Sequence, residues 1–143
     1  MRFFFDRNTC RRTARMLHIY GSDDGHEVRH HDDDLRFHPK SKDTEIIRTL
    51  HREDPGWVFL SGDGMILRNR VERATLAECN LTYVLLHPSW GNRKIEDTCW
   101  MMVKLWPNLL AEVGRLKVRS LLDLKYASSL RIDNRGATAG LRP

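Results

Sequence analysis

The feature that most constrains the fold is a set of short, continuously apolar runs separated by segments with helical spacing. The runs are Phe3–Phe5, Trp57–Leu60 and Leu81–Leu86. Runs of this kind are typical of strands buried on both faces of a parallel sheet. The alternation of such runs with helices predicts an α/β fold, with a mainly parallel sheet covered by helices on both faces.

Apolar residues recur with helical spacing in four segments, which are residues 10–20, 43–51, 71–79 and 92–113. Pro107 lies inside the last segment and predicts a kink or a break there. Glu27–His30 is a weaker strand candidate, and Val118–Leu124 suits either a strand or a helix. Residues 133–140 are polar and glycine-containing, which predicts disorder.

The net charge of +5 comes from one end of the chain. The stretch Arg115–Pro143 holds seven basic and two acidic residues, whereas residues 1–113 are balanced. A basic end suits contact with a polyanion or an acidic partner, and it equally suits a solvated tail.

The remaining composition indicates an ordinary globular protein. No apolar run approaches the roughly 20 residues that span a bilayer, so we expect a cytoplasmic protein with no membrane contact. The cysteines are widely spaced and form no Cys-x-x-Cys pair, so we expect buried free thiols. They are Cys10, Cys79 and Cys99.

Two acids follow predicted strands at the point where each strand ends. Asp6 comes directly after Phe3–Phe5, and Asp63 follows Trp57–Leu60 after two residues. Ligand sites of open α/β sheets form at this carboxyl edge. Asp43 and Glu45 begin a helix that enters from the same edge. Such a group of carboxylates repels itself unless a cation binds, and oxygen ligands suit Mg²⁺ or Mn²⁺.

Each of these acids also has a structural interpretation. Asp6 could end a strand, Asp43 is a natural helix N-cap, and Glu45 is favoured by the helix dipole. Asp63 lies between glycines and could be a turn residue. Other charged groups are equally open. A metal role for the histidines near three aspartates matches no known spacing, so a solvated loop is favoured for His26, His30 and His31. Either phosphate contacts or a solvated helix face would explain Arg68, Arg70 and Arg73.

At these residues the chain resembles the PIN-like domains related to VapC toxins, over roughly residues 1–113. Several motifs occur in the family's order. They are Phe3-Phe4-Phe5-Asp6-Arg7-Asn8, Asp43-Thr44-Glu45-Ile46-Ile47, Ser61-Gly62-Asp63-Gly64-Met65-Ile66, Arg68-Asn69-Arg70 with Glu72, Pro88-Ser89-Trp90-Gly91-Asn92 and Leu105-Trp106-Pro107.

The resemblance implies a three-layer α/β/α sandwich and a ribonuclease that depends on Mg²⁺ or Mn²⁺. Asp6, Asp63 and either Asp43 or Glu45 would be metal ligands, and water activated by the metal would attack phosphorus in line. It also implies a toxin held inactive by a cognate antitoxin, and leaves a homodimer open. Residues 1–113 would form the nuclease domain, and residues 114–143 a basic, partly disordered extension.

The chain departs from the family pattern at two places. Thr9 replaces the usual leucine after Asp-x-Asn, and a clear fourth acid is missing, for which the candidates are Glu72, Glu78, Glu96 and Asp97. Two other functions stay open. One is a non-catalytic module that binds RNA or protein. The other is a phosphatase with Asp6 as nucleophile, which Asn8 disfavours because that chemistry usually needs a second aspartate there.

Overall fold

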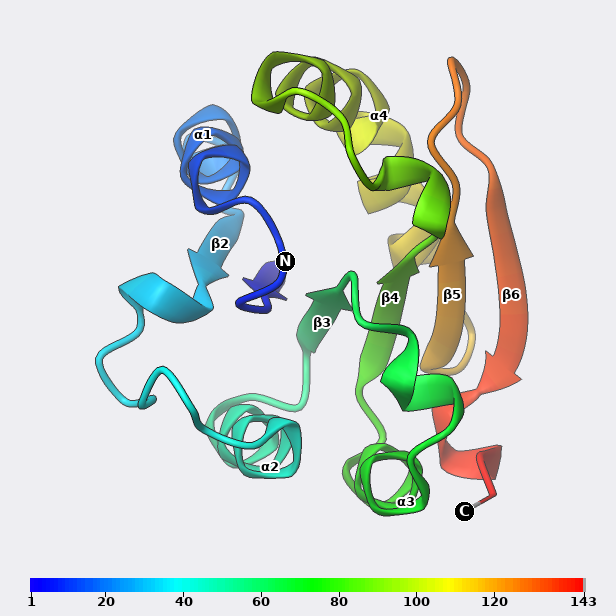
Figure 1. The fold of residues 1–143 in the computed structure, drawn as a ribbon. Coiled ribbons are helices and arrows are strands. Elements are labelled where there is room, and N and C mark those ends of the chain that lie inside the picture. The colour runs from blue at the N-terminus through cyan, green and yellow to red at the C-terminus, as the bar shows by residue number, and fades with distance from the viewer. Residues whose placement is uncertain (143) are drawn as a thin grey trace.

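A computed structural model describes residues 1–142. The chain forms one six-stranded sheet in the order β2-β1-β3-β4-β5-β6. Strands β1 to β5 run parallel, and β6 pairs antiparallel with β5. Helices cover both faces of the sheet, so the predicted three-layer α/β/α sandwich is confirmed (Figure 1).

The elements follow the predicted alternation closely. The strands are β1 (Arg2–Phe5), β2 (Glu27–His30), β3 (Trp57–Ser61), β4 (Thr82–Leu86), β5 (Ser120–Leu124) and β6 (Ile132–Ala137). The helices are α1 (Arg11–Ser22), α2 (Asp43–Glu53), α3 (Arg70–Cys79) and α4 (Ile95–Arg115). Short 3-10 helices are η1 (His31–Asp33), η2 (Gly64–Leu67), η3 (Pro88–Trp90) and η4 (Thr138–Gly140).

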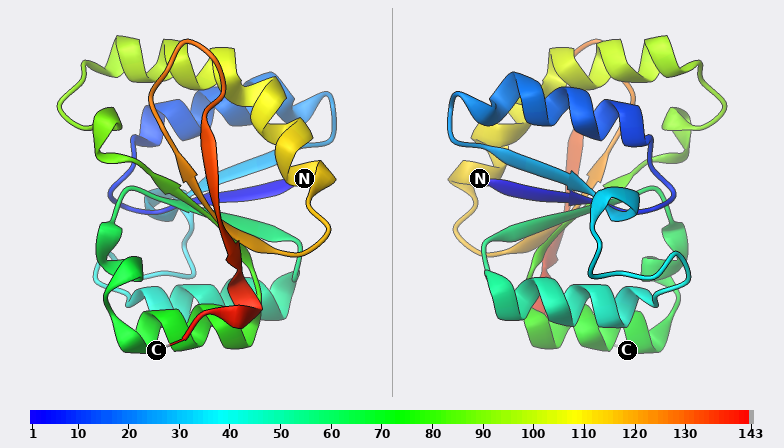
Figure 2. Two further views of the ribbon diagram at one scale, coloured as in Figure 1. Left: turned by 90° about the vertical axis from the view of Figure 1, so that its right-hand side faces the viewer. Right: turned by 90° about the vertical axis from the view of Figure 1, so that its left-hand side faces the viewer.

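Helices α1 and α4 lie on one face of the sheet, and α2 and α3 lie on the other (Figure 2). The strand β1 serves both layers because successive side chains point to opposite faces. Phe3 and Phe5 belong to the core beneath α1 and α4, whereas Phe4 belongs to the core beneath α2 and α3. Three consecutive phenylalanines are therefore compatible with a strand that is buried on both faces.

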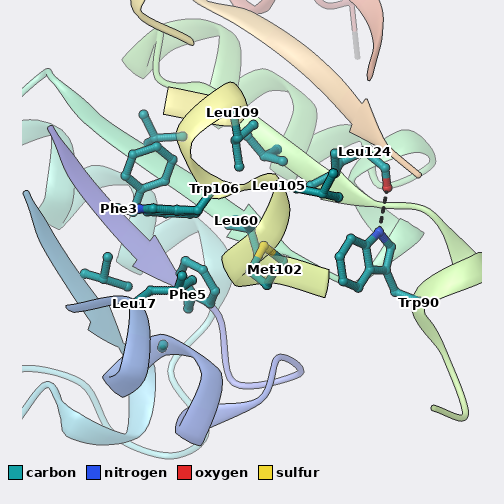
Figure 3. Packing of buried hydrophobic residues seen from close by; sticks show 14 of the residues in the cluster. Phe3, Phe5, Leu17, Leu60, Trp90, Met102, Leu105, Trp106, Leu109 and Leu124 are labelled. Atoms are coloured by element: carbon teal, nitrogen blue, oxygen red, sulfur yellow. Dashed lines mark hydrogen bonds between the residues drawn. The ribbon is translucent and has the colours of Figure 1, made fainter. Parts of the chain in front are cut away.

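The core beneath α1 and α4 centres on Trp106 (Figure 3). Its ring lies 4.7 Å from that of Phe3, between centroids, and it is fully buried. Trp90 lies at the border of the same core, where its indole N–H donates to the Leu124 carbonyl oxygen at 3.0 Å. Full burial of an apolar side chain such as Phe3 or Leu109 contributes about 1.5–3 kcal/mol to stability.

Helix α4 continues through Pro107 from Ile95 to Arg115. The predicted break is therefore wrong, while the alternative of a kink agrees with the change of direction of α4 in its second half (Figure 2). A proline inside a helix removes one backbone hydrogen bond and crowds the preceding turn, which bends the helix. Here packing of Trp106 and Leu109 on the sheet holds the two halves in one element.

The prediction of disorder over residues 133–140 is wrong, because this stretch forms most of β6 and η4. Polar composition misled the prediction, since β6 is an exposed edge strand held by backbone pairing and by charge. Arg135 donates to the buried carboxylate of Asp123 at 2.8 Å, and Thr138 donates to the Asn80 side-chain oxygen at 2.9 Å. Residues 120–137 thus add two strands, β5 and β6, to the sheet.

Within residues 1–142, no helix combines the length and the apolar character that crossing a bilayer needs. The three cysteines are free, as predicted; Cys79 is buried, whereas Cys10 and Cys99 are only half-buried.

Candidate active site

The two acids at the strand ends meet at the carboxyl edge of the sheet. Strands β1 and β3 are neighbours with Phe5 opposite Leu60, and the Asp6 amide donates to the Leu60 carbonyl oxygen at 2.9 Å. Asp6 and Ser61 continue the alternation of Phe4 and Phe59, so both side chains leave the sheet toward α2 and α3.

Hydrogen bonds fix the carboxylate of Asp6, which is almost fully buried. The Arg7 amide donates to its Oδ1 at 2.8 Å, and the Ser61 hydroxyl donates to its Oδ2 at 3.1 Å. The side chain of Asn8 ties this loop to the loop after β3, since its Oδ1 accepts from the Gly62 amide at 2.9 Å. Asp6 is therefore held in place before any ligand binds.

The loop that carries Asp63 is fixed in a similar way. The Asp63 amide donates to Ser61 Oγ at 3.0 Å, and its carboxylate caps η2 by accepting from the Met65 amide at 2.9 Å. The turn interpretation of Asp63 is correct as far as it goes, but the same side chain lines a cleft together with Asp6.

Two helix N-termini bring further acids to this cleft. Asp43 is the first residue of α2, and Glu72 lies in the first turn of α3. The side chain of Asn69 caps α3 by accepting from the amides of Val71 and Glu72 at 3.0 and 3.1 Å. Asp43 is not the N-cap of α2: that position is Lys42, which makes no side-chain cap.

The cleft has a volume of about 730 Å³ and holds four acids, Asp6, Asp43, Asp63 and Glu72. Burial raises the pKa of Asp43 to about 7, and the neighbouring charges of Asp6, Glu72 and Asp63 add to this rise. Burial also raises the pKa of Glu72, again with help from Asp63 and Asp6. The pKa of Asp6 is raised by burial in spite of its hydrogen bonds.

Three basic side chains also line the acidic cleft. Arg7, Lys40 and Lys42 line it. The guanidinium of Arg7 donates to the carbonyl oxygens of Pro39 and Ser41 and lies 3.8 Å from the Asp43 carboxylate. Arg7 thereby fastens the loop that leads into α2, which places Asp43 in the cleft. None of these three cations was predicted from the sequence, although Arg7 lies inside the Asp-x-Asn motif.

Other predicted acids lie elsewhere. Glu45 is exposed and does not line the cleft, in contrast to Asp43 two residues before it. Glu78 faces Arg48 at 3.9 Å, at the far end of α3. Glu96 and Asp97 are exposed in the first turn of α4. Of the candidates for the fourth acid, only Glu72 reaches the cleft.

The predicted arginines do not line the cleft either. Arg68 and Arg70 are exposed, and Arg73 donates to the carbonyl oxygens of Arg142 and Leu67 at 2.7 and 3.2 Å. Arg73 therefore fastens the end of the chain to α3. The solvated alternative agrees with the exposure of Arg68 and Arg70, and it is Lys40 and Lys42 that line the cleft.

The prediction of a solvated histidine loop is wrong for His30 and His31, which are both buried. His30 joins the backbone oxygen of Thr9 and the amide of Asp32, and the ring of His31 stacks on Phe37. These histidines therefore support the core at the end of β2. His26 stays half-buried beside the amino terminus, where its Nδ1 lies 2.9 Å from the N-terminal nitrogen.

The acids of the cleft have the donor chemistry of a site for a hard divalent cation, since they offer carboxylate oxygens only. These carboxylates do not point toward one common position in the structure. Among residues 1–142, no group of three His, Cys, Asp or Glu side chains is placed so that it could hold a metal ion. Binding an ion would require these carboxylates to turn toward one point.

Searches of curated proteins and of solved structures found no match to this chain. A profile of the family described as "PIN like domain" matches residues 1–88. This range includes β1 to β4, all four acids of the cleft and the three cations beside them. Because the match covers more than half of the chain and the fold agrees with it, the chain belongs to the PIN-like domain family.

Proposed function

We propose that this protein is a ribonuclease that uses Mg²⁺ or Mn²⁺. The observation that carries the proposal is the convergence of four acids, Asp6, Asp43, Asp63 and Glu72, in one cleft of a PIN-like fold. Within residues 1–142 only Asp43 among them has an ion-pair partner, Arg7 at 3.8 Å. Burial raises the pKa of Asp43 and of Glu72, and repulsion from the neighbouring acids adds to both rises. A divalent cation would relieve this repulsion.

Asp6, Asp63 and Asp43 would hold the ion, and Glu72 lines the same cleft. Asp6 would be the fixed ligand, because its hydrogen bonds to Ser61 and the Arg7 amide leave little freedom. The ion, when bound, would neutralise negative charge on the phosphate oxygens and lower the pKa of a water molecule. Asp43 would give up its proton as the cation binds, since a nearby positive charge favours the ionised carboxylate against the effect of burial.

Arg7, Lys40 and Lys42 would bind phosphates on either side of the cleaved bond. They lie on the same cleft as the acids. Lysine and arginine contacts to phosphates provide affinity without reading sequence, so these residues would position the RNA strand. These cations come from the loop between η1 and α2 and from the loop after β1.

The experiment compares the wild-type protein with Asp63→Asn on labelled single-stranded RNA, with Mn²⁺ and with EDTA. We expect cleavage by the wild type with Mn²⁺ alone, and a loss of at least about 100-fold in the variant. Asp24→Asn is the matched control, since Asp24 is exposed after α1. RNA binding without cleavage by the wild type would instead support a binding module.

We further propose that the protein acts as a toxin with a cognate antitoxin, which is supported by its family and by the resemblance to VapC relatives. The same pair of proteins tests this. Expression of the wild type would arrest growth, and expression of Asp63→Asn would not. Equal growth under both would argue against the toxin role but not against cleavage in vitro.

A further inference from the structure

A second hollow lies at the carboxyl edge of the sheet, on the other side of Asn8 from the acidic cleft. It is lined by the loops after β1, β3 and β4 and by Thr98 of α4. Asn8 lines both hollows, and its Oδ1 accepts from the amide of Gly62, which lines the second hollow. A nucleic-acid strand that places a phosphate in the acidic cleft can therefore place a neighbouring group here.

The second hollow differs from the cleft in charge. The residues that line it, all in the described range 1–142, include no Asp, Glu, Lys or Arg. Its walls come instead from apolar and neutral polar side chains, among them Leu86, Pro88, Trp90 and Thr98. An uncharged hollow disfavours a phosphate and suits a neutral ring.

The polar group of the hollow is set by the hydrogen bonds of His87. The Ser89 amide donates to its Nδ1 at 3.0 Å, and the Ser89 hydroxyl lies 2.9 Å from the same atom. Because a backbone N–H can only donate, neutral His87 carries its proton on Nε2. The ring thus offers one N–H donor whose orientation is fixed by η3.

The walls are equally fixed. Trp90 is 7% exposed, and its indole N–H is used by the Leu124 carbonyl oxygen (Figure 3). Its ring therefore serves as an apolar wall and not as a donor. The volume of about 250 Å³ lies below the roughly 300 Å³ at which pockets for drug-sized ligands begin. The hollow suits one ring system, and it is too small for a whole nucleotide.

We propose that this hollow, named the base pocket, binds one nucleobase of the RNA strand beside the phosphate held in the acidic cleft. This inference rests on the proposed function for its ligand. His87 Nε2–H donates to an acceptor on the base, and Trp90, Leu86 and Pro88 surround the ring. The base leaves the stack, which favours single-stranded RNA, since an unpaired base is turned out at lower cost.

The test measures RNA binding, so that it does not depend on cleavage. Asp63→Asn protein is titrated with a short single-stranded RNA, and with versions that lack one base at successive positions. We expect the loss of one particular base to weaken binding about tenfold, with smaller effects elsewhere. Adding His87→Phe, which removes the donor and fills the pocket, should abolish the difference between these RNAs.

His18→Phe is the matched control, because His18 is exposed on α1 and lines neither hollow. It should keep the full dependence on that base. The inference is overturned if every base removal has the same effect, or if His87→Phe retains the dependence while its melting temperature is unchanged. Dependence on the base without any cleavage by the wild type would leave the base pocket standing and refute the ribonuclease.

Discussion

The two ends of strand β1 carry groups of acids that differ in how they are compensated. At the amino end, Arg2 contacts the carboxylates of Glu27, Glu53 and Asp54 at 2.8, 2.7 and 3.4 Å. At the carboxyl end, the only ion pair to the four acids of the cleft within residues 1–142 is that of Arg7 with Asp43, at 3.8 Å. The two groups differ in direct ion pairs and also in burial, since Asp6 and Asp43 are more buried than the acids around Arg2.

The pKa values follow this difference. Burial by itself would raise the pKa of Glu27, but hydrogen bonds from Arg2 and Arg29 lower it overall. The pKa of Glu53 is lowered by Arg2 and Arg36 against the same effect of burial. At the other end of the strand burial is not offset, and the pKa of Asp43 rises to about 7. Ionised Glu27 and Glu53 therefore stabilise the fold, whereas ionised Asp43 opposes it.

The largest effect is expected from Asp43→Asn in metal-free buffer. The rise from 3.8 to about 7 corresponds to at most about 4 kcal/mol against folding. Relaxation and solvent should reduce this penalty to about 2 kcal/mol. The variant should therefore be more stable than the wild type at about pH 8, as measured by urea unfolding with EDTA.

The pH dependence gives the sign of this effect. Between about pH 7 and pH 4 the folded protein holds a proton on Asp43 that the unfolded chain releases. The penalty is thus full above the folded pKa and shrinks as the pH falls, so the advantage of Asp43→Asn should vanish toward pH 4. An advantage that is constant with pH, or a variant less stable at pH 8, would contradict the raised pKa of Asp43.

A smaller and opposite effect is expected from Arg2→Gln. It removes the partner of three acids and a guanidinium that lies 4.2 Å from the centre of the Trp57 ring. We expect a loss of about 1–2 kcal/mol at neutral pH. The loss should diminish as the pH falls through the lowered pKa values of Glu27, Glu53 and Asp54, because protonated acids no longer need Arg2.

Arg48→Gln is the control for this variant. Arg48 is half exposed and lies 3.9 Å from an exposed carboxylate, so its loss should cost under about 0.5 kcal/mol. Urea unfolding of both variants at neutral and acidic pH makes the comparison. Equal losses for the two arginines would show that the amino-end group adds no more than ordinary surface pairs.

The sequence predicted the parallel strands well because their signals are local. A continuous apolar run such as Trp57–Leu60 indicates burial directly. The glycines on either side of Asp63 indicate the end of the strand. It failed at β6, whose residues are polar because the strand lies at the edge and pairs through its backbone. No local feature of residues 132–137 indicates that they pair with β5.

The candidate site divides in the same way. Asp6 and Asp63 follow strand ends, so their convergence needed only the parallel sheet. Lys40 and Lys42 lie in an irregular loop whose course depends on Arg7, and no spacing in the sequence reports that contact. Glu72 was one of four candidates, and the choice required knowing that α3 begins at the cleft while α4 does not.

The smallest effect is expected from Glu45→Gln, which tests the choice between Asp43 and Glu45. Residues two apart on a helix do not share a face, so an α2 that turns Asp43 into the cleft turns Glu45 away from it. Glu45 is exposed, and its remaining role is to favour the helix dipole. We expect less than about a twofold change in cleavage and a loss of up to about 0.5 kcal/mol in stability.

Asp43→Asn in the same cleavage assay provides the contrast, with an expected loss of at least about tenfold. Both changes replace one carboxylate by its amide in the first turn of α2, so helix formation is disturbed similarly in each. A loss with Glu45→Gln that matches that of Asp43→Asn would mean that α2 turns when RNA and metal bind. The cleft would then gain a fifth acid, and its excess of negative charge over the amino end of β1 would be larger still.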